Sequence, residues 1–256
     1  MSENYNNSSA EHDELKRSLS NRHLQLIAIG GAIGTGLFMG SGKTISLAGP
    51  SILVIYMIIG FMVFLVMRAL GELLLSNLQY KSFIDFATDL IGPWAGYFVG
   101  WTYWLCWITI GIADLSAIIY YLQFFNNGLP FSPEEGVMIS IASIVFIIGL
   151  NLVTVKLFGE MEFWFALVKI IAIVVLIAVG LWMIFTGFTS DAGTVASFSH
   201  IWDHGGIFPT GAMGFLAGFQ IAIFAFVGVE LVGTTAAETK DPEKNLPKAV
   251  NSIPIR

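Results

Sequence analysis

Six long apolar segments constrain the fold of this chain more than any other feature of its sequence. They lie near residues 24–45, 51–75, 94–125, 137–155, 163–188 and 210–237. Each is long enough to cross roughly 30 Å of hydrocarbon as an α-helix. A segment that crosses a bilayer must satisfy its backbone hydrogen bonds internally, which an α-helix does. The sequence therefore predicts an all-α integral membrane protein.

Composition supports this class and excludes others. Of the 256 residues, 55% are hydrophobic and 12% are charged, whereas a soluble domain carries about 25% charged residues. The net charge is -6 and no basic stripe is present, so the chain is not expected to bind nucleic acid. A single cysteine, Cys106, excludes an internal disulfide and a cysteine-based metal site.

The distribution of basic residues predicts a cytoplasmic N-terminus. Loops on the cytoplasmic side of membrane proteins carry an excess of Lys and Arg. With this orientation the following basic residues are cytoplasmic: Lys16, Arg17, Arg22, Lys81, Lys156, Lys240, Lys244, Lys248 and Arg256. Only Lys43 lies near the outer side. We therefore expect a disordered cytoplasmic tail over residues 1–20, six helices within 21–238, and a cytoplasmic connection over 239–256 toward a missing seventh helix.

The cytoplasmic stretch 81–90 predicts a short amphipathic helix. Its apolar residues follow helical spacing: Phe83, Phe86, Ala87 and Leu90. Such a helix either lies on the membrane surface or packs on the ends of neighbouring helices. The sequence leaves both alternatives open.

The first apolar segment is unusually rich in glycine, a residue that weakens a helix by about 1 kcal/mol relative to alanine. Gly30, Gly31 and Gly40 are interpreted as sites of close helix packing. The tripeptide Gly34-Thr35-Gly36 is different, because it lies about 11 residues beyond Leu24, or roughly 16 Å at the helical rise, near the bilayer midplane. We expect the helix to unwind there.

The sixth apolar segment carries a matching feature at FAFVGVE, residues 224–230. Gly228 and Glu230 lie near the midplane by the same measure. Interrupted helices at corresponding positions of two halves indicate a transporter binding site. Because helices 1 and 6 are five apart, two inverted five-helix repeats are predicted, of which this chain would hold the first and one helix of the second.

Four longer stretches resemble the amino acid–polyamine–organocation superfamily, and within it the bacterial amino acid transporter family. They read NRHLQLIAIGGAIGTGLFMGSGKTISLAGPS, RALGELLLSNLQYKSFIDFATDLIGPWAGYFVGWTYW, FGEMEFWFALVKI and GFQIAIFAFVGVELVGTTAAETKDPEKNLPKAVNSIPIR. The resemblance implies a LeuT-type inverted-repeat transporter fold. Members of the family have twelve membrane helices, so this chain departs from them by truncation after the first repeat and helix 6.

The same resemblance implies a function in amino acid transport. The implied activity is import of small neutral amino acids by proton symport across the bacterial plasma (inner) membrane, with no cofactor and the proton gradient as the energy source. D-Alanine, D-serine and glycine are the implied substrates, with L-alanine as a further candidate. Another specificity, an exchanger, and a channel-like or structural membrane subunit stay open. The expected partners are the amino acid, protons and lipid, and no oligomeric state is predicted.

Helix interruptions suit a zwitterion, because a helix start offers N–H groups to a carboxylate and a helix end offers carbonyls to an ammonium group. By resemblance, the carboxylate is assigned to Gly34, Thr35 and Gly36. The ammonium group is assigned to carbonyls around Ala32, Ile33, Phe224 and Val227, beside Gly228. Phe226 resembles the family's aromatic gate over the substrate, with simple packing as the alternative.

Ionisable residues within the spans are costly, at about 2.5–3.5 kcal/mol each on an insertion scale, and each requires an explanation. Lys169 either snorkels to the cytoplasm or contacts helix 1 carbonyls, where by resemblance it substitutes for the sodium ion of sodium-coupled relatives. Glu230 either carries a proton or makes a structural hydrogen bond. Lys169 and Glu230 are predicted to share proton coupling.

Three further polar residues within the spans have open or structural roles. Asp114 lines the substrate pocket, or interacts with Arg68 or with a backbone group. Arg68 and Glu72 are four residues apart on one helix face and are predicted to pair.

Other chemistry finds little support in the sequence. No nucleophile–base set or phosphate-binding loop is present, so the chain is predicted not to be an enzyme. His200 and His204 could bind a metal ion if their outer loop were helical, but two histidines are a weak signal and no metal site is predicted. Trp101, Trp104 and Trp107 follow helical spacing that favours packing over substrate stacking.

Overall fold

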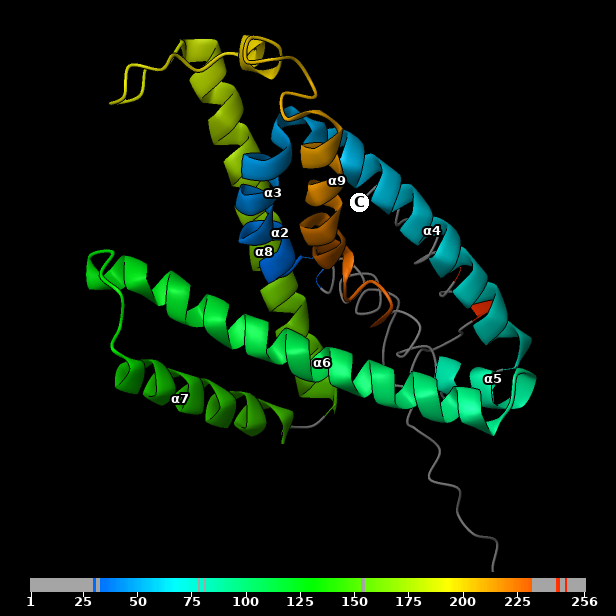
Figure 1. Cartoon of the computed structure of the whole chain (residues 1–256). Helices are drawn as coiled ribbons and strands as arrows, with labels where there is room; N and C mark the ends of the chain where they lie inside the picture. The colour runs from blue at the N-terminus through cyan, green and yellow to red at the C-terminus, as the bar shows by residue number, and fades with distance from the viewer. Residues whose placement is uncertain are drawn as a thin grey trace, which may run out of the picture.

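The computed structural model of the chain is helical and describes residues 30, 33–77, 79–80, 82–152, 155–231, 243–244 and 247 (Figure 1). Within this described part, the β-structure is one isolated bridge between Thr189 and Val195. The predicted tail over 1–20 and nearly all of the connection over 239–256 lie outside the described residues.

The first part of the described chain folds into two helical arms joined by a tight turn. Its elements are α2 (Thr35–Phe38), α3 (Gly40–Ala48), η1 (Gly49–Ser51) and α4 (Ile52–Ser76). The turn depends on Gly49, whose φ of +61° is a conformation that favours glycine, and on Pro50 at the first position of η1. It brings α4 back beside α3.

The amphipathic helix expected within residues 81–90 is present as α5 (Phe83–Leu90). Ser82 caps its start in a capping box with Asp85. Phe86 is buried and packs with Met67 and Leu74 of α4, and its ring contacts the ring of Tyr80 edge-on. Of the two alternatives, packing on the ends of neighbouring helices is the one that the structure realises.

The remaining elements complete the helical array around the centre of the molecule. They are α6 (Pro93–Leu122), η2 (Gln123–Asn126), α7 (Pro133–Asn151), α8 (Val155–Thr186), η3 (Phe198–Ile201), α9 (Gly211–Ala222) and η4 (Ile223–Phe226). In Figure 1, α6 runs across the lower part of the molecule, and α7 returns beside it. A long loop connects α8 to α9 at the end opposite α6.

Helices α3, α4 and α9 pack together around a buried apolar cluster. Ala48, Ile55, Ile59 and Ala222 form one buried cluster. Gly218 lies so close to this cluster that a Cβ atom there would meet Ile55 Cδ1 at 2.6 Å. This packing fixes the position of α9 and therefore of the segment that follows it.

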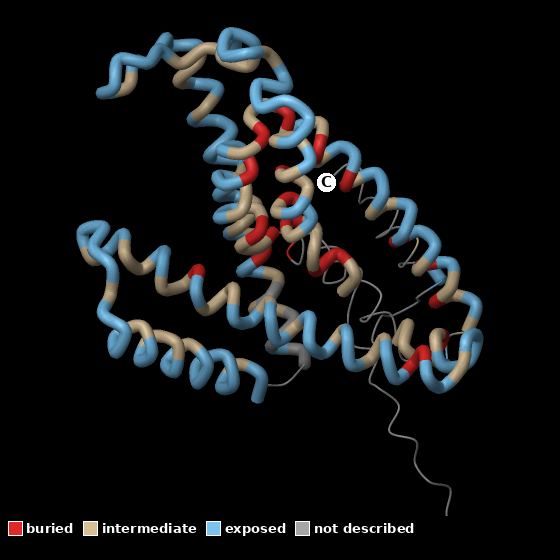
Figure 2. The backbone as a smooth tube through the Cα atoms, in the orientation of Figure 1, coloured by how far each residue is buried: buried red, intermediate tan, exposed pale blue. Residues whose placement is uncertain are grey.

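Many residues of α6 and α7 are exposed, drawn in pale blue in Figure 2, and many of the exposed residues of α6, α7 and α8 are large and apolar. Phe146 of α7 is 64% exposed and Leu176 of α8 is 73% exposed. Apolar surface of this extent requires an apolar surrounding. Four stretches of the described residues are long and apolar enough to cross a membrane: Thr35–Ser76, Pro93–Asn126, Pro133–Asn151 and Phe163–Thr186.

The four stretches correspond to the first five of the six predicted spans. Thr35–Ser76 runs through the first two predicted spans, and the beginning of the first lies outside the described residues. The sixth predicted span is represented by a shorter apolar helix, Gly211–Phe226. That helix is short because it ends at an interruption.

Candidate substrate cavity between two interrupted helices

The first interruption lies at Ile33 and Gly34. Gly30 is helical, Gly34 is extended with φ -131° and ψ -163°, and α2 begins at Thr35. The Leu37 N–H group donates to the Gly34 carbonyl at 3.1 Å, which starts the new helix. The predicted unwinding of the first span is therefore present at Gly34, and the new helix starts at the residue that follows.

The second interruption lies at Val227 and Gly228. Helix α9 tightens into the 3-10 turn η4 and stops, because Val227 is extended with φ -67° and ψ 138°. Gly228 then takes a φ of +100°, which side-chain-bearing residues rarely adopt. The Leu231 N–H group donates to the Gly228 carbonyl at 3.2 Å as the chain turns again.

The two interruptions touch, although about 190 residues separate them. A Cβ atom on Gly36 would lie 2.5 Å from the Phe224 carbonyl oxygen and 2.7 Å from the Ala225 nitrogen. Glycine at position 36 therefore lets the backbone of α2 approach the backbone of η4. The resemblance assigns Gly36 to the substrate carboxylate, and the structure adds a packing reason for glycine at this position.

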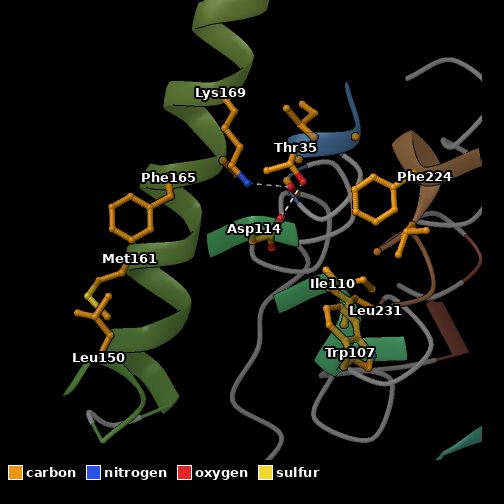
Figure 3. A pocket seen from close by; sticks show the side chains of 17 residues that line it. Thr35, Trp107, Ile110, Asp114, Leu150, Met161, Phe165, Lys169, Phe224 and Leu231 are labelled. Carbon is orange, nitrogen blue, oxygen red and sulfur yellow. Dashed lines mark hydrogen bonds between the residues drawn. The ribbon is translucent and has the colours of Figure 1, made fainter. Parts of the chain in front are cut away.

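A cavity of about 310 Å³ lies beside this contact (Figure 3). Segments from both interruptions, α6, α7 and α8 line it. The lining includes these residues of the predicted site: Ile33, Gly34, Thr35, Gly36, Asp114, Lys169, Phe224, Val227 and Gly228. Residues from distant parts of the sequence thus meet at one concave surface, the usual setting of a small-molecule site.

Asp114 and Thr35 form the polar contact between α6 and the first interruption. The Thr35 hydroxyl donates to Asp114 Oδ1 at 2.7 Å, drawn as a dashed line in Figure 3. Of the alternatives for Asp114, lining the pocket is therefore the one that the structure realises. Arg68 instead bonds Glu72 at 3.3 Å, as predicted.

Lys169 reaches from α8 toward the segment that precedes the first interruption. Its Nζ atom donates to the Gly30 carbonyl oxygen at 3.2 Å. Gly30 also packs against α8, since a Cβ atom there would lie 2.7 Å from Ala166 Cβ. The ammonium group therefore contacts helix 1, as predicted, and does not snorkel to the cytoplasm.

Among the described residues, two members of the predicted site are not in this lining. Phe226 and Glu230 line a separate apolar groove against α4, where the Phe226 ring contacts the Tyr56 ring edge-on at 5.6 Å between centroids. Glu230 Oε2 accepts from the Gly228 N–H group at 2.9 Å, so its bond holds the interruption locally and does not cross the bundle. Ala32 lies outside the described residues.

The cavity also includes apolar residues that were not predicted: Trp107, Ile110, Leu150, Met161, Phe165, Ala166 and Leu231. Helical spacing could have identified some of them. Trp107 and Ile110 precede Asp114 by seven and four residues on α6, and Phe165 precedes Lys169 by four on α8. Such residues share a helix face with the polar one.

Together the fold and the cavity define a multi-pass membrane protein with a cavity between two interrupted helices. The sequence model of the amino acid permease family matches residues 23–256, and the chain belongs to that family.

Several curated proteins are similar to this chain over nearly all of its length. The D-serine/D-alanine/glycine transporter of Escherichia coli (strain K12) is 69% identical over 242 residues, which cover 94% of this chain and 50% of that protein. The amino-acid permease AapA of Bacillus subtilis (strain 168) is 53% identical, and the match covers 96% of this chain and 52% of that protein. The aromatic amino acid transport protein AroP of Escherichia coli (strain K12) is 45% identical, and the match covers 95% of this chain and 52% of that protein. The chain thus spans about half the length of these relatives.

Proposed function

We propose that this chain forms the substrate-binding half of a secondary active transporter that imports small neutral amino acids by proton symport. The observation that carries the proposal is the meeting of two interrupted helices at one cavity. The transporter works across the bacterial plasma (inner) membrane with the N-terminus in the cytoplasm. It needs no cofactor, because the proton gradient supplies the energy.

The start of α2 binds the substrate carboxylate. The first N–H groups of a helix have no partner within the helix, and the helix dipole favours negative charge there. At this helix the groups belong to Thr35 and Gly36, beside Gly34. A Cβ atom built on Gly34 would meet nothing within 4 Å, so a ligand can approach the backbone closely there.

Carbonyl groups and one carboxylate bind the substrate ammonium group. The proposed acceptors are backbone carbonyls around Ala32, Ile33, Phe224 and Val227, beside Gly228. The helical pattern is broken at Ile33 and again at Val227. Asp114 adds a negative charge in the lining, and its contact with Thr35 uses only one of several acceptor sites on the carboxylate. A zwitterion is thereby bound between opposite charges.

The proposed preference for small neutral side chains comes from the relatives and not from the cavity. Recognition through backbone groups leaves the side chain of the substrate unspecified, so the preference rests on the relatives. The relative named for D-serine, D-alanine and glycine is 69% identical, whereas the one named for aromatic amino acids is 45% identical. The proposed substrates are therefore D-alanine, D-serine and glycine, with L-alanine as a further candidate.

Proton coupling is assigned to Lys169 and Glu230, because each holds one interruption. Lys169 donates to Gly30, just before the first interruption, and Glu230 accepts from Gly228, within the second. Loss of a proton from Lys169, or gain of one by Glu230, weakens the bond that it makes. Protonation thus changes how firmly each interruption is held, and through it the substrate site.

The test of transport is uptake of radiolabelled D-alanine, D-serine and glycine in cells with low background uptake. The chain is expressed alone and together with the C-terminal half of the Escherichia coli K12 relative, which supplies the length that this chain does not cover. Saturable uptake that rises with external acidity, in either arrangement, supports a symporter. Current without saturation indicates a channel, turnover without flux indicates an enzyme, and no uptake in both arrangements overturns the proposal.

The test of coupling compares Lys169→Ala and Glu230→Gln with two exposed controls, Lys43→Ala and Glu72→Gln. Both site variants are expected to lose acid-stimulated uptake while substrate exchange continues. The controls are expected to keep it. If both site variants keep normal pH-dependent uptake, the coupling assignment is wrong even where transport itself is observed.

A further inference from the structure

The loop between α8 and α9 holds two histidines with their rings side by side. The rings of His200 and His204 are nearly parallel, at 10°, and their centroids are 5.7 Å apart. Neither residue belongs to the cavity between the interrupted helices. In the predicted topology this loop lies on the outer side of the membrane.

The local backbone places both histidines on one face. Ser197 caps the start of η3 by accepting the Ser199 N–H group. The Ser199 carbonyl then accepts the Asp203 N–H group at 3.0 Å, and the Trp202 carbonyl accepts the Gly206 N–H group at 3.0 Å. These bonds continue the helical turn past η3, so residues four apart are neighbours. His200 therefore lies in η3, and His204 lies in the hydrogen-bonded turn that follows it.

A backbone contact fixes the tautomer of His200. Its Nε2 atom lies 2.7 Å from the Val195 carbonyl oxygen. Because a carbonyl only accepts, Nε2 must carry the hydrogen. In the neutral ring Nδ1 is then the bare nitrogen, with its lone pair available. Histidines that bind metals usually donate their other ring N–H group to a carbonyl or carboxylate in this way.

We propose that His200 and His204 bind one divalent transition-metal ion. A metal–nitrogen bond of about 2.1 Å puts the ion about 3.2 Å from a ring centroid, so two rings on one ion have centroids at most about 6.4 Å apart. The observed 5.7 Å lies within this limit. His204 is exposed, and a turn of its ring out of the parallel arrangement directs both lone pairs at the ion.

The ligand set determines which ion the site takes. Among the described residues, no three His, Cys, Asp or Glu side chains gather to hold a metal ion. The site therefore supplies two imidazoles and leaves the remaining positions to water. Imidazole suits Cu²⁺, Ni²⁺ and Zn²⁺, whereas Mg²⁺, Ca²⁺ and Mn²⁺ prefer oxygen ligands. The expected affinity is highest for Cu²⁺, lower for Ni²⁺ and Zn²⁺, and lowest for Mn²⁺.

The experiment measures metal binding to the whole chain in detergent, purified through a tag that contains no histidine. Equilibrium dialysis gives the affinity for Zn²⁺ and Cu²⁺, and electron paramagnetic resonance of bound Cu²⁺ reports its nitrogen ligands. His204→Gln leaves the contact between His200 and Val195 intact, so it tests the site with little risk to the loop. His200→Gln tests the second ligand, and His12→Gln and His23→Gln are the matched controls.

The proposal expects one ion per chain, with nitrogen ligation, and affinity lowered at least about tenfold in His200→Gln and His204→Gln. The two controls should bind as the unchanged chain does. It is overturned if no Zn²⁺ or Cu²⁺ binds, or if binding is lost only in the His12 and His23 variants. The readout is independent of transport, so it stands or fails separately from the proposed function.

Discussion

The two interruptions serve one cavity but are built in different ways. At the first, Gly34 is extended, with a backbone conformation that any residue adopts. At the second, Gly228 has a φ of +100°, which favours glycine strongly. The glycine that faces the other interruption is Gly36, inside α2, and its role is steric. Glycine is thus required for conformation at one interruption and for close approach at the other.

The glycines of these membrane helices are therefore not equivalent. A side chain at position 36 would meet backbone atoms of η4, one at position 228 would be strained by the positive φ, and one at position 34 would enter open space. A methyl group added at each position therefore measures a different physical quantity. Replacing the three in turn separates packing, backbone conformation and ligand approach.

The largest effect is expected for Gly36→Ala. The added methyl would lie 2.5 Å from the Phe224 carbonyl oxygen, and backbone atoms cannot move aside as a flexible side chain can. We expect a loss of about 3 kcal/mol of stability, at the upper end of overpacking costs. The measurement is the apparent melting temperature in detergent, followed by size-exclusion chromatography.

Gly42→Ala is the matched control for this variant. It lies in α3, just beyond α2, and a Cβ atom there meets nothing within 4 Å. It should keep or raise the melting temperature, since alanine favours a helix by about 1 kcal/mol over glycine. If Gly36→Ala has the same melting temperature as Gly42→Ala, the two interruptions do not make the close contact described above.

A smaller effect is expected for Gly228→Ala. At a φ of +100° an L-residue is strained, and we expect a cost of about 1–2 kcal/mol. The added methyl should also disturb the hydrogen bond from Gly228 to Glu230. The melting temperature should fall less than in Gly36→Ala, while Gly111→Ala, in open space on α6, serves as control. If Gly228→Ala and Gly111→Ala have the same melting temperature, Gly228 does not have a left-handed conformation.

Much of this arrangement could be predicted from the sequence, because it depends on local pattern. The apolar spans, the interruption at Gly34 and the amphipathic helix α5 follow from composition, glycine placement and spacing. These features need no knowledge of how distant helices cross.

The rest depended on tertiary contacts that one sequence does not specify. Phe226 and Glu230 lie only two residues on either side of Gly228, yet they face the groove against α4 and not the cavity. Val227 is extended and Gly228 has a φ of +100°, so the helix is broken there and helical spacing does not apply across it. Met161 and Leu150 reach the cavity only because α7 and α8 pass beside α6. The contact of Asp114 with Thr35 likewise required the crossing of α6 and α2.

The smallest effect on stability, and the sharpest test of the site, is expected for Gly34→Ala. The backbone there suits any residue, and a Cβ atom would meet nothing within 4 Å. The melting temperature should therefore stay close to that of the unchanged chain, as for surface substitutions that cost within about 0.5 kcal/mol. If the substrate carboxylate approaches the backbone at this point, however, the methyl group occupies its path.

Gly34→Ala is accordingly expected to raise the KM for D-alanine uptake with the melting temperature unchanged, whereas Gly36→Ala lowers both stability and uptake. Uptake is measured with the chain expressed together with the C-terminal half of the Escherichia coli K12 relative. Gly42→Ala, the same glycine-to-alanine change at another position, is the control. An unchanged KM in a stable Gly34→Ala protein would show that the carboxylate does not bind at the first interruption. The open space beside Gly34 would then be a consequence of packing alone, and the second interruption would have to hold the substrate by itself.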